Sequence, residues 1–362
     1  KGKRMAIPEK MSGVVLMGHG GLEKLVWRTD LPVPVAGKNE VLIRVGASSV
    51  NNTDVNTRTG WYSKAVRGDT ASGAADGYLA DTGADGSWSG KPLSFPHIQG
   101  ADCCGEIVAV GEGVPASRIG ERVLVRALQT VKADGQEPAI WTFGSETNGG
   151  FAQYATARSH DALAINSRLS DVELASFPCA FSTAEGMMQR AGVKAERVLI
   201  TGASGGVGSA AIQLAKRRGA HVTAVTSGEK AADLRLLGAD ETLDRDAVPL
   251  QQSFDVVLDL VGGASWGKLI DALCNRGRYV TSGAIAGPIV ELDLRTLYLR
   301  DLTLLGSTYQ PDNVFQDLVT YIEAGEIRPV VAETYPLREL RAAQEKFLEK
   351  AFIGKIAIDV GA

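Results

Sequence analysis

Four side chains that could bind a metal ion lie close together in the segment "HIQGADCCGE": His97, Asp102, Cys103 and Cys104. Imidazole, carboxylate and thiolate groups are the ligands that zinc prefers in proteins. Neighbouring side chains of a strand point to opposite faces, however, so Cys103 and Cys104 cannot easily reach one ion. Three interpretations stay open: a buried pair of small apolar cysteines, an irregular zinc site, or a redox-sensing thiol.

A glycine-rich turn gives the strongest sign of ligand binding. In "VLITGASGGVGSAAIQLAK" an apolar strand ends at Thr201, and a helix follows the turn at once. Glycine lets the backbone approach a pyrophosphate, and the N-terminus of the helix offers N–H donors and partial positive charge. This context predicts a dinucleotide site, with a purely structural turn as the alternative. Its residues are Ala203, Ser204, Gly205, Gly206, Val207 and Gly208, with Ala203, Gly206 and Gly208 in the fingerprint positions.

The end of the next strand indicates which dinucleotide binds. Proteins that bind NAD usually have an acidic residue there for the ribose 2′-hydroxyl. This chain has "VTSGEK" instead, with Thr226, Ser227 and Gly228 at that place, followed closely by Lys230, and Arg245 is a second candidate cation further on. Both cations can pair with a 2′-phosphate, so we expect NADPH; the alternative is that they are ordinary surface charges.

The elements that would position these groups fall into two parts. Short apolar runs separated by turn residues predict strands at 40–50, 105–114 and 121–128. From Val198 onward strands alternate with helices, including a helix at about 265–274, which predicts a parallel, doubly wound sheet. The final "FIGKIAIDVGA" reads as a strand that returns to the first part. Residues 64–94, rich in Gly, Asp, Ala and Ser, are expected to form a long loop or lid.

Composition limits the class of protein. The chain has 362 residues, a net charge of −4 and no long Lys/Arg run, so we expect no nucleic-acid partner. No apolar run reaches the roughly 18–20 residues that span a bilayer, and no apolar segment follows the basic N-terminus, so we expect neither a membrane partner nor a signal peptide. Four cysteines are too few for a disulfide framework in a chain of this length, which favours a cytoplasmic location.

Five segments in this order resemble the medium-chain dehydrogenase/reductase superfamily: "SVNNTDVNTRTGWY", "GADCCGEIVAVGEGV", "GGFAQYA", "STAEGMM" and "GASGGVG". Within it the chain is most similar to the zinc-free quinone oxidoreductases, which include zeta-crystallin, except in residues 64–94. The resemblance implies an α/β protein with a β-rich GroES-like catalytic domain (1–165 and 320–362) and a doubly wound Rossmann cofactor domain (166–319). It also implies a homodimer that pairs edge strands near "DLTLLGS".

The resemblance bears on the metal question. Zinc alcohol dehydrogenases of this superfamily have a catalytic cysteine where this chain has Asn51, and Gly-His-Glu where it has Gly100, Ala101 and Asp102. Neither an amide nor a methyl group is a useful zinc ligand. The resemblance therefore favours buried apolar cysteines and no metal site.

The resemblance also implies roles for single residues. Asn51 is expected to donate a hydrogen bond to the substrate oxygen or the cofactor ribose, and Tyr62 to donate a hydrogen bond or a proton beside the nicotinamide. The alternatives are an asparagine that holds a turn and a tyrosine that packs. Asp54 and Arg58 are expected to be structural, and Lys355 to lie either beside the site or on the surface. Further cofactor contacts are implied for Thr183, Gly262, Gly263, Ser282, Gly283, Ala284, Ser307 and Thr308.

These residues favour one reaction over others. Without zinc no Lewis acid lowers the pKa of an alcohol, so hydride transfer from NADPH to an already electrophilic quinone or α,β-unsaturated carbonyl is easier. The main hypothesis is therefore an NADPH-dependent quinone or enone reductase. An unusual zinc alcohol dehydrogenase and a non-catalytic NADPH-binding protein are the alternatives.

Overall fold

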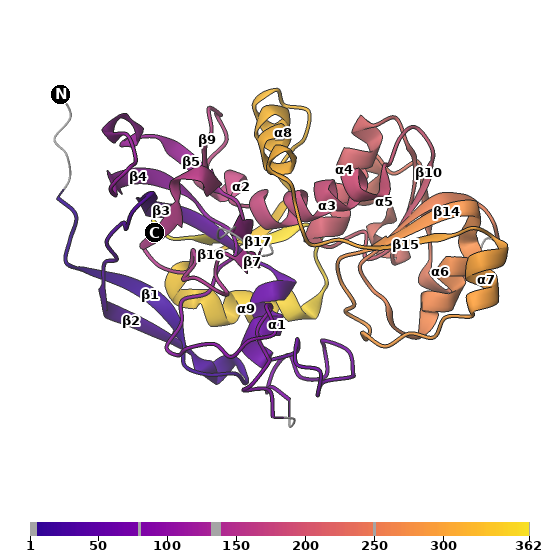
Figure 1. Ribbon diagram of the computed structural model, residues 1–362, viewed down its shortest axis with the longest axis horizontal. Helices are drawn as coiled ribbons and strands as arrows, with labels where there is room; N and C mark the ends of the chain where they lie inside the picture. Colours follow the sequence, from indigo (N-terminus) through magenta and orange to yellow (C-terminus); the bar gives the residue numbers. More distant parts are fainter. Residues whose placement is uncertain (1–5, 79–80, 132–138, 249–250, 362) are drawn as a thin grey trace.

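The chain folds into two lobes, each built around one large β-sheet (Figure 1). The computed structural model describes residues 6–78, 81–131, 139–248 and 251–361. We refer to the lobes by their sheets, the seven-stranded lobe and the six-stranded lobe. Helix α3 (Pro178–Ala191) lies between them in Figure 1.

The seven-stranded lobe forms from the short apolar runs in the first part of the chain. Its central strand β3 (Glu40–Val50) pairs antiparallel with β4 (Cys104–Val110), β8 (Tyr154–Arg158) and β17 (Lys355–Asp359). Since β17 comes from the end of the chain, the expected return of the last strand is confirmed (Figure 1). The other strands of this sheet are β5 (Arg122–Val125), β9 (Ala162–Ala164) and β16 (Val331–Pro336). Two hairpins accompany it, β1 (Lys10–Leu16) with β2 (Leu25–Pro32) and β6 (Leu128–Val131) with β7 (Ala139–Thr142).

The six-stranded lobe is a parallel sheet with the strand order β12-β11-β10-β13-β14-β15. Its central strand β10 pairs with both β11 and β13, so the chain order reverses beside β10. Ligands of such sheets bind in the crevice at this reversal, outside the carboxyl ends of the strands. The predicted doubly wound fold is therefore confirmed. The strands are β10 (Arg197–Ile200), β11 (His221–Val225), β12 (Glu241–Leu243), β13 (Phe254–Asp259), β14 (Leu273–Thr281) and β15 (Thr303–Gly306).

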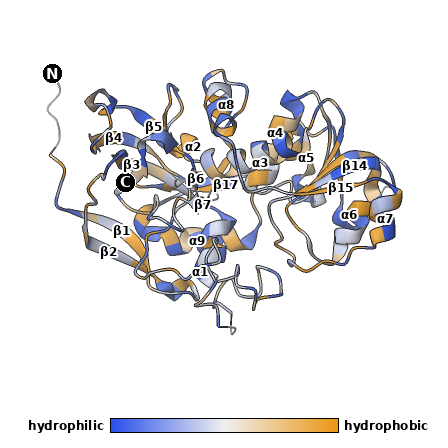
Figure 2. Cartoon of the chain, viewed as in Figure 1, coloured by the Kyte–Doolittle hydropathy of each residue, from blue (hydrophilic) through white to orange (hydrophobic). Residues whose placement is uncertain are grey.

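Amphipathic helices cover the sheets. Helix α4 (Gly206–Arg217) buries its small and apolar residues Ala210, Ile212 and Leu214 in the core and keeps Arg217 outside. Figure 2 shows both hydrophobic and hydrophilic colour on α4 and on α9 (Leu340–Glu349), as expected for helices with one buried face. The other helices are α1 (Asn52–Thr59), α2 (Asp171–Leu174), α5 (Ala231–Leu237), α6 (Trp266–Ala272), α7 (Leu294–Leu299) and α8 (Asp312–Glu323).

Three predicted elements differ from the structure, two of them because of long-range contacts. The predicted strand 121–128 is interrupted, because Arg126 is buried and turns its guanidinium group to Asp161 at 2.6 and 2.8 Å. The predicted helix 265–274 ends at Ala272, because Leu273 already pairs with β13 as the first residue of β14. In both places long-range contacts outweigh the local sequence pattern. The third, the predicted strand 105–114, ends at Val110, because the chain then turns and the Val114 N–H donates to the Gly111 carbonyl at 3.2 Å.

The segment 64–94 is a loop without helix or strand in its described residues, as predicted. Its inner part is attached to the seven-stranded lobe by Arg58, which is fully buried. The guanidinium group donates to the Gln344 side chain at 2.9 Å and to the carbonyl oxygens of Gly20 and Ala74 at 2.9 and 2.6 Å. Arg58 therefore joins α1, α9 and the loop, which supports the structural role expected for it.

Arg58→Met is expected to lower the free energy of unfolding by about 3 kcal/mol, because two buried acceptors and one partly buried acceptor lose a charged donor. Urea unfolding followed by circular dichroism measures this change. Arg28→Met is the matched control, since Arg28 is exposed and its one ion pair with the described residues is to Asp30 at 2.8 Å. Equal stability of the two variants would contradict the structural role of Arg58.

No helix among the described residues is long and apolar enough to cross a membrane. The two sheets do not by themselves fix the limits of two domains. The boundaries at residues 165, 166, 319 and 320 therefore stay a prediction.

Candidate active site

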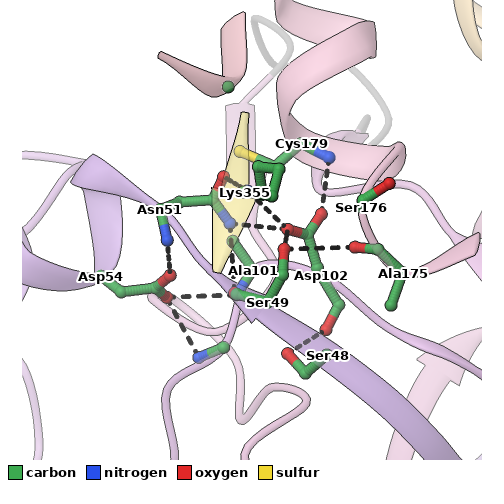
Figure 3. Close-up of polar contacts among 12 residues, drawn as sticks. Ser48, Ser49, Asn51, Asp54, Ala101, Asp102, Ala175, Ser176, Cys179 and Lys355 are labelled. Carbon is green, nitrogen blue, oxygen red and sulfur yellow. Dashed lines mark hydrogen bonds and ion pairs between the residues drawn. The ribbon is translucent and has the colours of Figure 1, made fainter. Parts of the chain in front are cut away.

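A buried polar cluster lies around the carboxylate of Asp102, where the two lobes meet (Figure 3). Oδ2 of Asp102 accepts a hydrogen bond from the Asn51 amide at 2.7 Å, and Oδ1 accepts one from the backbone N–H of Cys179 at 2.7 Å. The Ser49 hydroxyl also donates to Oδ2. A buried carboxylate needs such donors to stay charged, and β3, α1 and α3 provide them.

Lys355 contributes the positive charge of this cluster. Its ammonium group lies 3.1 Å from Oδ2 of Asp102 and also donates to Oδ1 of Asn51. Lys355 is 3% exposed, so of the two places that the sequence left open, the structure shows the one beside the site. As the first residue of β17 it enters the cluster from the end of the chain.

Asn51 and Asp54 shape the start of α1. The backbone N–H of Asn51 donates to Asp54 at 2.8 Å, and the N–H groups of Gly100 and Ala101 donate to the other carboxylate oxygen at 3.2 Å each. Asp54 thus holds the turn that carries Asp102, in line with the structural role expected for it. Desolvation by burial raises the pKa of Asp54 to about 7.

Tyr62 follows α1 and is partly buried. Its hydroxyl donates to Oγ1 of Thr53 at 3.1 Å, which keeps the phenol near the first turn of α1. Burial raises the pKa of Tyr62 to about 12. The phenol therefore keeps its proton at neutral pH and can act as a donor.

The glycine-rich turn lies at the carboxyl end of β10, as the motif requires. Gly202 has a φ of +58°, which favours glycine, and Gly205 is the N-cap of α4. A Cβ atom on Gly208 would lie 2.2 Å from the carbonyl oxygen of Gly202, so only glycine lets the helix pack this closely on the strand. The Ser204 carbonyl accepts a hydrogen bond from the backbone N–H of Gly354 at 2.9 Å. The turn is therefore attached directly to the segment that leads to Lys355.

Cations gather beside this turn. The Lys230 ammonium donates to the Lys350 carbonyl oxygen at 2.6 Å and lies 3.4 Å from Oγ of Ser204. Desolvation and the charge of Arg245 lower the pKa of Lys230. Desolvation and the charges of Lys230 and Lys355 lower the pKa of Lys350 to about 7. The predicted residues Lys230 and Arg245 are therefore close together, and Lys350 joins them from the other lobe.

The remaining predicted cofactor residues lie on loops at the same edge of the sheet. The Gly263 N–H bonds to the Gly287 carbonyl at 3.0 Å, and a Cβ atom on Gly262 would lie 3.3 Å from that of Ala284. The Ser282 hydroxyl donates to the carbonyl of Ser307. These contacts bring together Gly262, Gly263, Ser282, Gly283, Ala284 and Ser307, while Thr308 is exposed at the end of β15.

The long loop reaches the same edge from the other lobe. Thr70 donates its backbone N–H to the carbonyl oxygen of Ile285 at 2.9 Å, and its hydroxyl lies 3.3 Å from that oxygen. Ile285 follows directly after Ala284 in the chain. The loop therefore spans the junction between the lobes beside the predicted nicotinamide segment.

The residues that raised the metal question do not converge. Nε2 of His97 lies 3.2 Å from the carbonyl oxygen of Gly144. Cys103 and Cys104 belong to two different core clusters and are fully buried, as expected for strand neighbours. Burial raises the pKa of both thiols, so both stay protonated and pack as small apolar side chains.

Several site residues were not singled out from the sequence. Cys179 and Lys350 lie far apart in the chain and outside the quoted segments, so only the fold brings them to the site. Ser49 opens the segment "SVNNTDVNTRTGWY" but was given no role of its own. Thr183, one turn beyond Cys179 on α3, lies on the same helix face as expected for a residue at the lobe junction. The buried hydroxyl of Thr226 at the end of β11 has no hydrogen-bond partner among the described residues.

Comparison with known proteins places the chain in a family. Residues 37–167 match the alcohol dehydrogenase GroES-like domain, and residues 237–358 match the zinc-binding dehydrogenase family. A solved structure from Sinorhizobium meliloti 1021, named as a candidate alcohol dehydrogenase, is 43% identical with a TM-score of 0.86, covering 98% of both chains. Human quinone oxidoreductase is 27% identical over 95% of this chain and 96% of its own. Acryloyl-coenzyme A reductase of Metallosphaera sedula is 27% identical over 96% and 99%.

The family description raises the question whether zinc fits this site. Among the described residues, no group of three or more His, Cys, Asp or Glu side chains could hold a metal ion. Cys179 offers a thiol, but the Asn51 amide and the Ser49 hydroxyl beside Asp102 are not the nitrogen and sulfur ligands that zinc prefers. The Asp102 carboxylate is occupied by Lys355, whose ammonium group stands among the polar side chains. The residues of the cluster therefore do not fit zinc.

A dinucleotide does fit the edge of the six-stranded sheet. Gly205 leaves open space at the N-terminus of α4, since an added Cβ atom would meet only the Gly202 carbonyl at 3.5 Å. The N–H groups of this helix turn, the free hydroxyl of Thr226 and the ammonium of Lys230 suit phosphate and ribose groups. Together with the relatives, this site shows that the chain belongs to the medium-chain dehydrogenase/reductase superfamily, on its quinone oxidoreductase branch, and is an oxidoreductase of the nicotinamide-dinucleotide-dependent type.

Proposed function

We propose that the protein uses NADPH to reduce quinones or α,β-unsaturated carbonyl compounds, and that it does so without zinc. The observation that carries this proposal is the polar cluster at Asp102, which holds the ammonium group of Lys355 and no set of zinc ligands. A site without a Lewis acid favours acceptors that are already electrophilic. Relatives named for quinone and for acryloyl-coenzyme A share such an acceptor, a carbonyl group conjugated with a C=C bond.

The cations beside the glycine-rich turn support NADPH as the dinucleotide. The charge of Arg245 lowers the pKa of Lys230, and the charge of Lys230 lowers the pKa of Lys350. The Lys230 ammonium also donates to the backbone carbonyl of Lys350. Mutual repulsion of this kind is relieved by a bound anion, and a 2′-phosphate carries up to two negative charges. We assign the 2′-phosphate to Lys230, Lys350 and Arg245, with Ser227 at the adjacent strand end.

The protein's own groups bind, orient and protonate the reactants. Reduced nicotinamide, when bound, supplies a hydride ion. The N-terminus of α4 and the loops at Gly262 and Ser282 hold the dinucleotide at the edge of the sheet. The loop 64–94 covers the junction through Thr70, which limits the shape of the acceptor. In this proposal Tyr62 faces the acceptor. Burial raises the pKa of Tyr62 to about 12, so the phenol keeps its proton at neutral pH and can donate it to the anion that hydride transfer leaves.

Tyr62→Phe is expected to lower kcat by about 10²-fold while changing the affinity for NADPH little, because one donor to the reacting oxygen is lost. Steady-state kinetics and a fluorescence titration with NADPH separate the two quantities. Tyr78→Phe is the control, since its hydroxyl bonds to the Asp69 carbonyl at 2.8 Å within the loop. An unchanged kcat in Tyr62→Phe would contradict the proposed role of Tyr62 as a donor in the reaction.

The proposed function is tested by following the loss of reduced-nicotinamide absorbance with a panel of acceptors. The panel contains 1,4-benzoquinone, 9,10-phenanthrenequinone, an enal, an enone and an acryloyl thioester, each with NADPH and with NADH. We expect turnover with NADPH and at least one of these acceptors, and no oxidation of simple alcohols with NADP⁺. Alcohol oxidation without reduction of any conjugated acceptor would favour the alcohol dehydrogenase alternative. NADPH binding without any turnover would favour the non-catalytic one.

We also propose a homodimer in the cytoplasm. Strand β15 is an edge of its sheet, and nearby α7 exposes Leu294, Tyr298 and Leu299. An unpaired edge with apolar neighbours favours association with a second copy. The four cysteines are free, in keeping with a reducing compartment. Light scattering at several concentrations tests the dimer, and a monomer at all of them would contradict it.

A further inference from the structure

The proposed function leaves one feature of Lys355 unexplained, a positive charge buried where the two lobes meet. The Lys355 side chain is 4% exposed, and its partner Asp102 is fully buried. Taking a lysine ammonium out of water costs several kcal/mol, even when an acid pairs with it. A buried charge that is kept at such a cost suggests a role in the reaction.

The path of the side chain places its ammonium group between the two halves of the site. A Cβ atom added to Gly206 would lie 2.7 Å from Cδ of Lys355, so the lysine stem passes directly against the first residue of α4. From there Nζ reaches Oδ1 of Asn51, the N-cap of α1. The charge therefore lies between the proposed phosphate loop and the helix whose first turn holds Tyr62.

Two of the three N–H donors of the Lys355 ammonium group are used within the cluster. Asp102 is already held by Ser49, Asn51 and the backbone N–H of Cys179, so it does not depend on Lys355 alone. An ammonium group has three N–H donors. Two of them are used, by Asn51 and Asp102, and the third has no partner among the described residues. Asp102 and Asn51 thus orient the ammonium group and leave one donor free for a ligand.

We propose that the Lys355 ammonium group is a catalytic residue that donates a hydrogen bond to the carbonyl oxygen of the acceptor, in the role that a metal ion has in zinc enzymes. This inference rests on the proposed function. In the reaction the β-carbon of the acceptor gains a hydride from NADPH, which becomes NADP⁺. The C=C π electrons move toward the carbonyl, whose oxygen becomes negative. Lys355 stabilises that oxygen, and the enolate then takes up one proton, from Tyr62 or water, to give the saturated carbonyl compound.

The test uses a binding signal besides activity. The enal 4-(dimethylamino)cinnamaldehyde absorbs at longer wavelength when a cation or hydrogen-bond donor polarises its carbonyl oxygen. It is added to the intact protein with NADP⁺, so that no reduction takes place. Lys355→Met is compared with the double variant Lys355→Met/Asp102→Asn, which removes both charges and leaves no unpaired buried carboxylate. Lys216→Met is the matched control, because Lys216 pairs with Asp240 on the surface at 2.9 Å.

We expect a red shift of the bound enal with the wild type and with Lys216→Met, and no shift with either Lys355 variant. With NADPH the Lys355 variants should lose about 10²- to 10³-fold in kcat, the effect of removing one oxyanion donor. The NADPH dissociation constant, measured by fluorescence, should stay within error of the wild type in the double variant. Thermal unfolding of the double variant shows whether it is folded.

Two results would overturn the proposal. The first is a wild type that binds the enal without a red shift, and the second is a double variant with the full shift. If that double variant also binds NADPH more weakly than the wild type, Lys355 is a phosphate ligand instead. Failure of the proposed function looks different: the wild type would show the lysine-dependent shift and yet oxidise no NADPH with any acceptor.

Discussion

Gly208→Ala is expected to lower the free energy of unfolding by about 3 kcal/mol and to abolish detectable dinucleotide binding. The added Cβ atom would lie 2.2 Å from the Gly202 carbonyl oxygen and 2.6 Å from Cα of Ala203. Both neighbours are backbone atoms of the glycine-rich turn, so no side chain can rotate away to make room. Helix α4 would have to move away from β10, and its N-terminal N–H groups would leave the phosphate position.

Gly205→Ala is the matched control for this prediction. Gly205 has a φ of −73°, and its added Cβ atom would meet only the Gly202 carbonyl at 3.5 Å, an ordinary contact. Its thermal unfolding should therefore stay close to that of the wild type. Chemical unfolding and a fluorescence titration with NADPH measure both variants. Equal stability of Gly208→Ala and Gly205→Ala would mean that the turn does not pack as described.

The double variant Lys230→Ala/Lys350→Met is expected to lower the preference for NADPH over NADH by about 10³-fold, since two charge-assisted contacts contribute roughly 4 kcal/mol. The Lys230 ammonium lies 3.4 Å from Oγ of Ser204 in the glycine-rich turn and donates to the backbone carbonyl of Lys350. The ammonium group of Lys350 donates to the Asn52 side chain at 3.1 Å. NADH lacks the 2′-phosphate, so its affinity should change little. Dissociation constants for both cofactors, measured with wild type, single and double variants, test this.

The same cations predict a pH dependence of NADPH binding. Because the pKa of Lys350 is about 7 in the free protein, the lysine is charged below pH 7 and neutral above it. A bound phosphate favours the charged form, so binding above pH 7 must take up a proton. The affinity for NADPH should therefore fall by up to about tenfold per pH unit as the pH rises above 7. NADH should show no such slope, and Lys350→Met should remove it for NADPH.

Either of two results would contradict this assignment. One is a double variant that loses affinity for NADPH and NADH equally, which would place the lysines at the pyrophosphate shared by both cofactors. The other is an unchanged preference for NADPH, which would make Lys230 and Lys350 ordinary surface charges. Lys216→Met serves as the control for lysine removal in general, because Lys216 pairs with Asp240.

The sequence predicted correctly those parts of the molecule whose conformation is set by residues that are neighbours in the chain. The glycine-rich turn with its strand and helix, the apolar runs of the two sheets and the loop at 64–94 each show their conformation in a few neighbouring residues. Where a distant partner decides the structure, prediction failed. Arg126 breaks the strand predicted at 121–128 because it turns to Asp161, and Leu273 ends the helix predicted at 265–274 because it pairs with β13.

The same distinction holds for the site. The sequence predicted Asn51 as a hydrogen-bond donor to the reactants, and that role stays a prediction. The structure shows that its amide donates to Asp102 at 2.7 Å and that its oxygen accepts a hydrogen bond from Lys355. Asn51 and Lys355 are separated by most of the chain, and their contact depends on the antiparallel pairing of β3 with β17. No spacing or motif could show it. The position of Lys355 beside Asp102, which bears on whether the cluster fits zinc, depends on the same pairing.

We propose that the protein reduces a conjugated acceptor at a site whose positive charge comes from Lys355 and not from zinc. The most direct test of this proposal is the zinc content of the purified protein by atomic spectroscopy, measured on the same sample as NADPH-dependent turnover with and without a chelator. We expect turnover that the chelator leaves unchanged, in protein with far less than one zinc per chain. One zinc per chain, with turnover that a chelator abolishes and added zinc restores, would contradict the account.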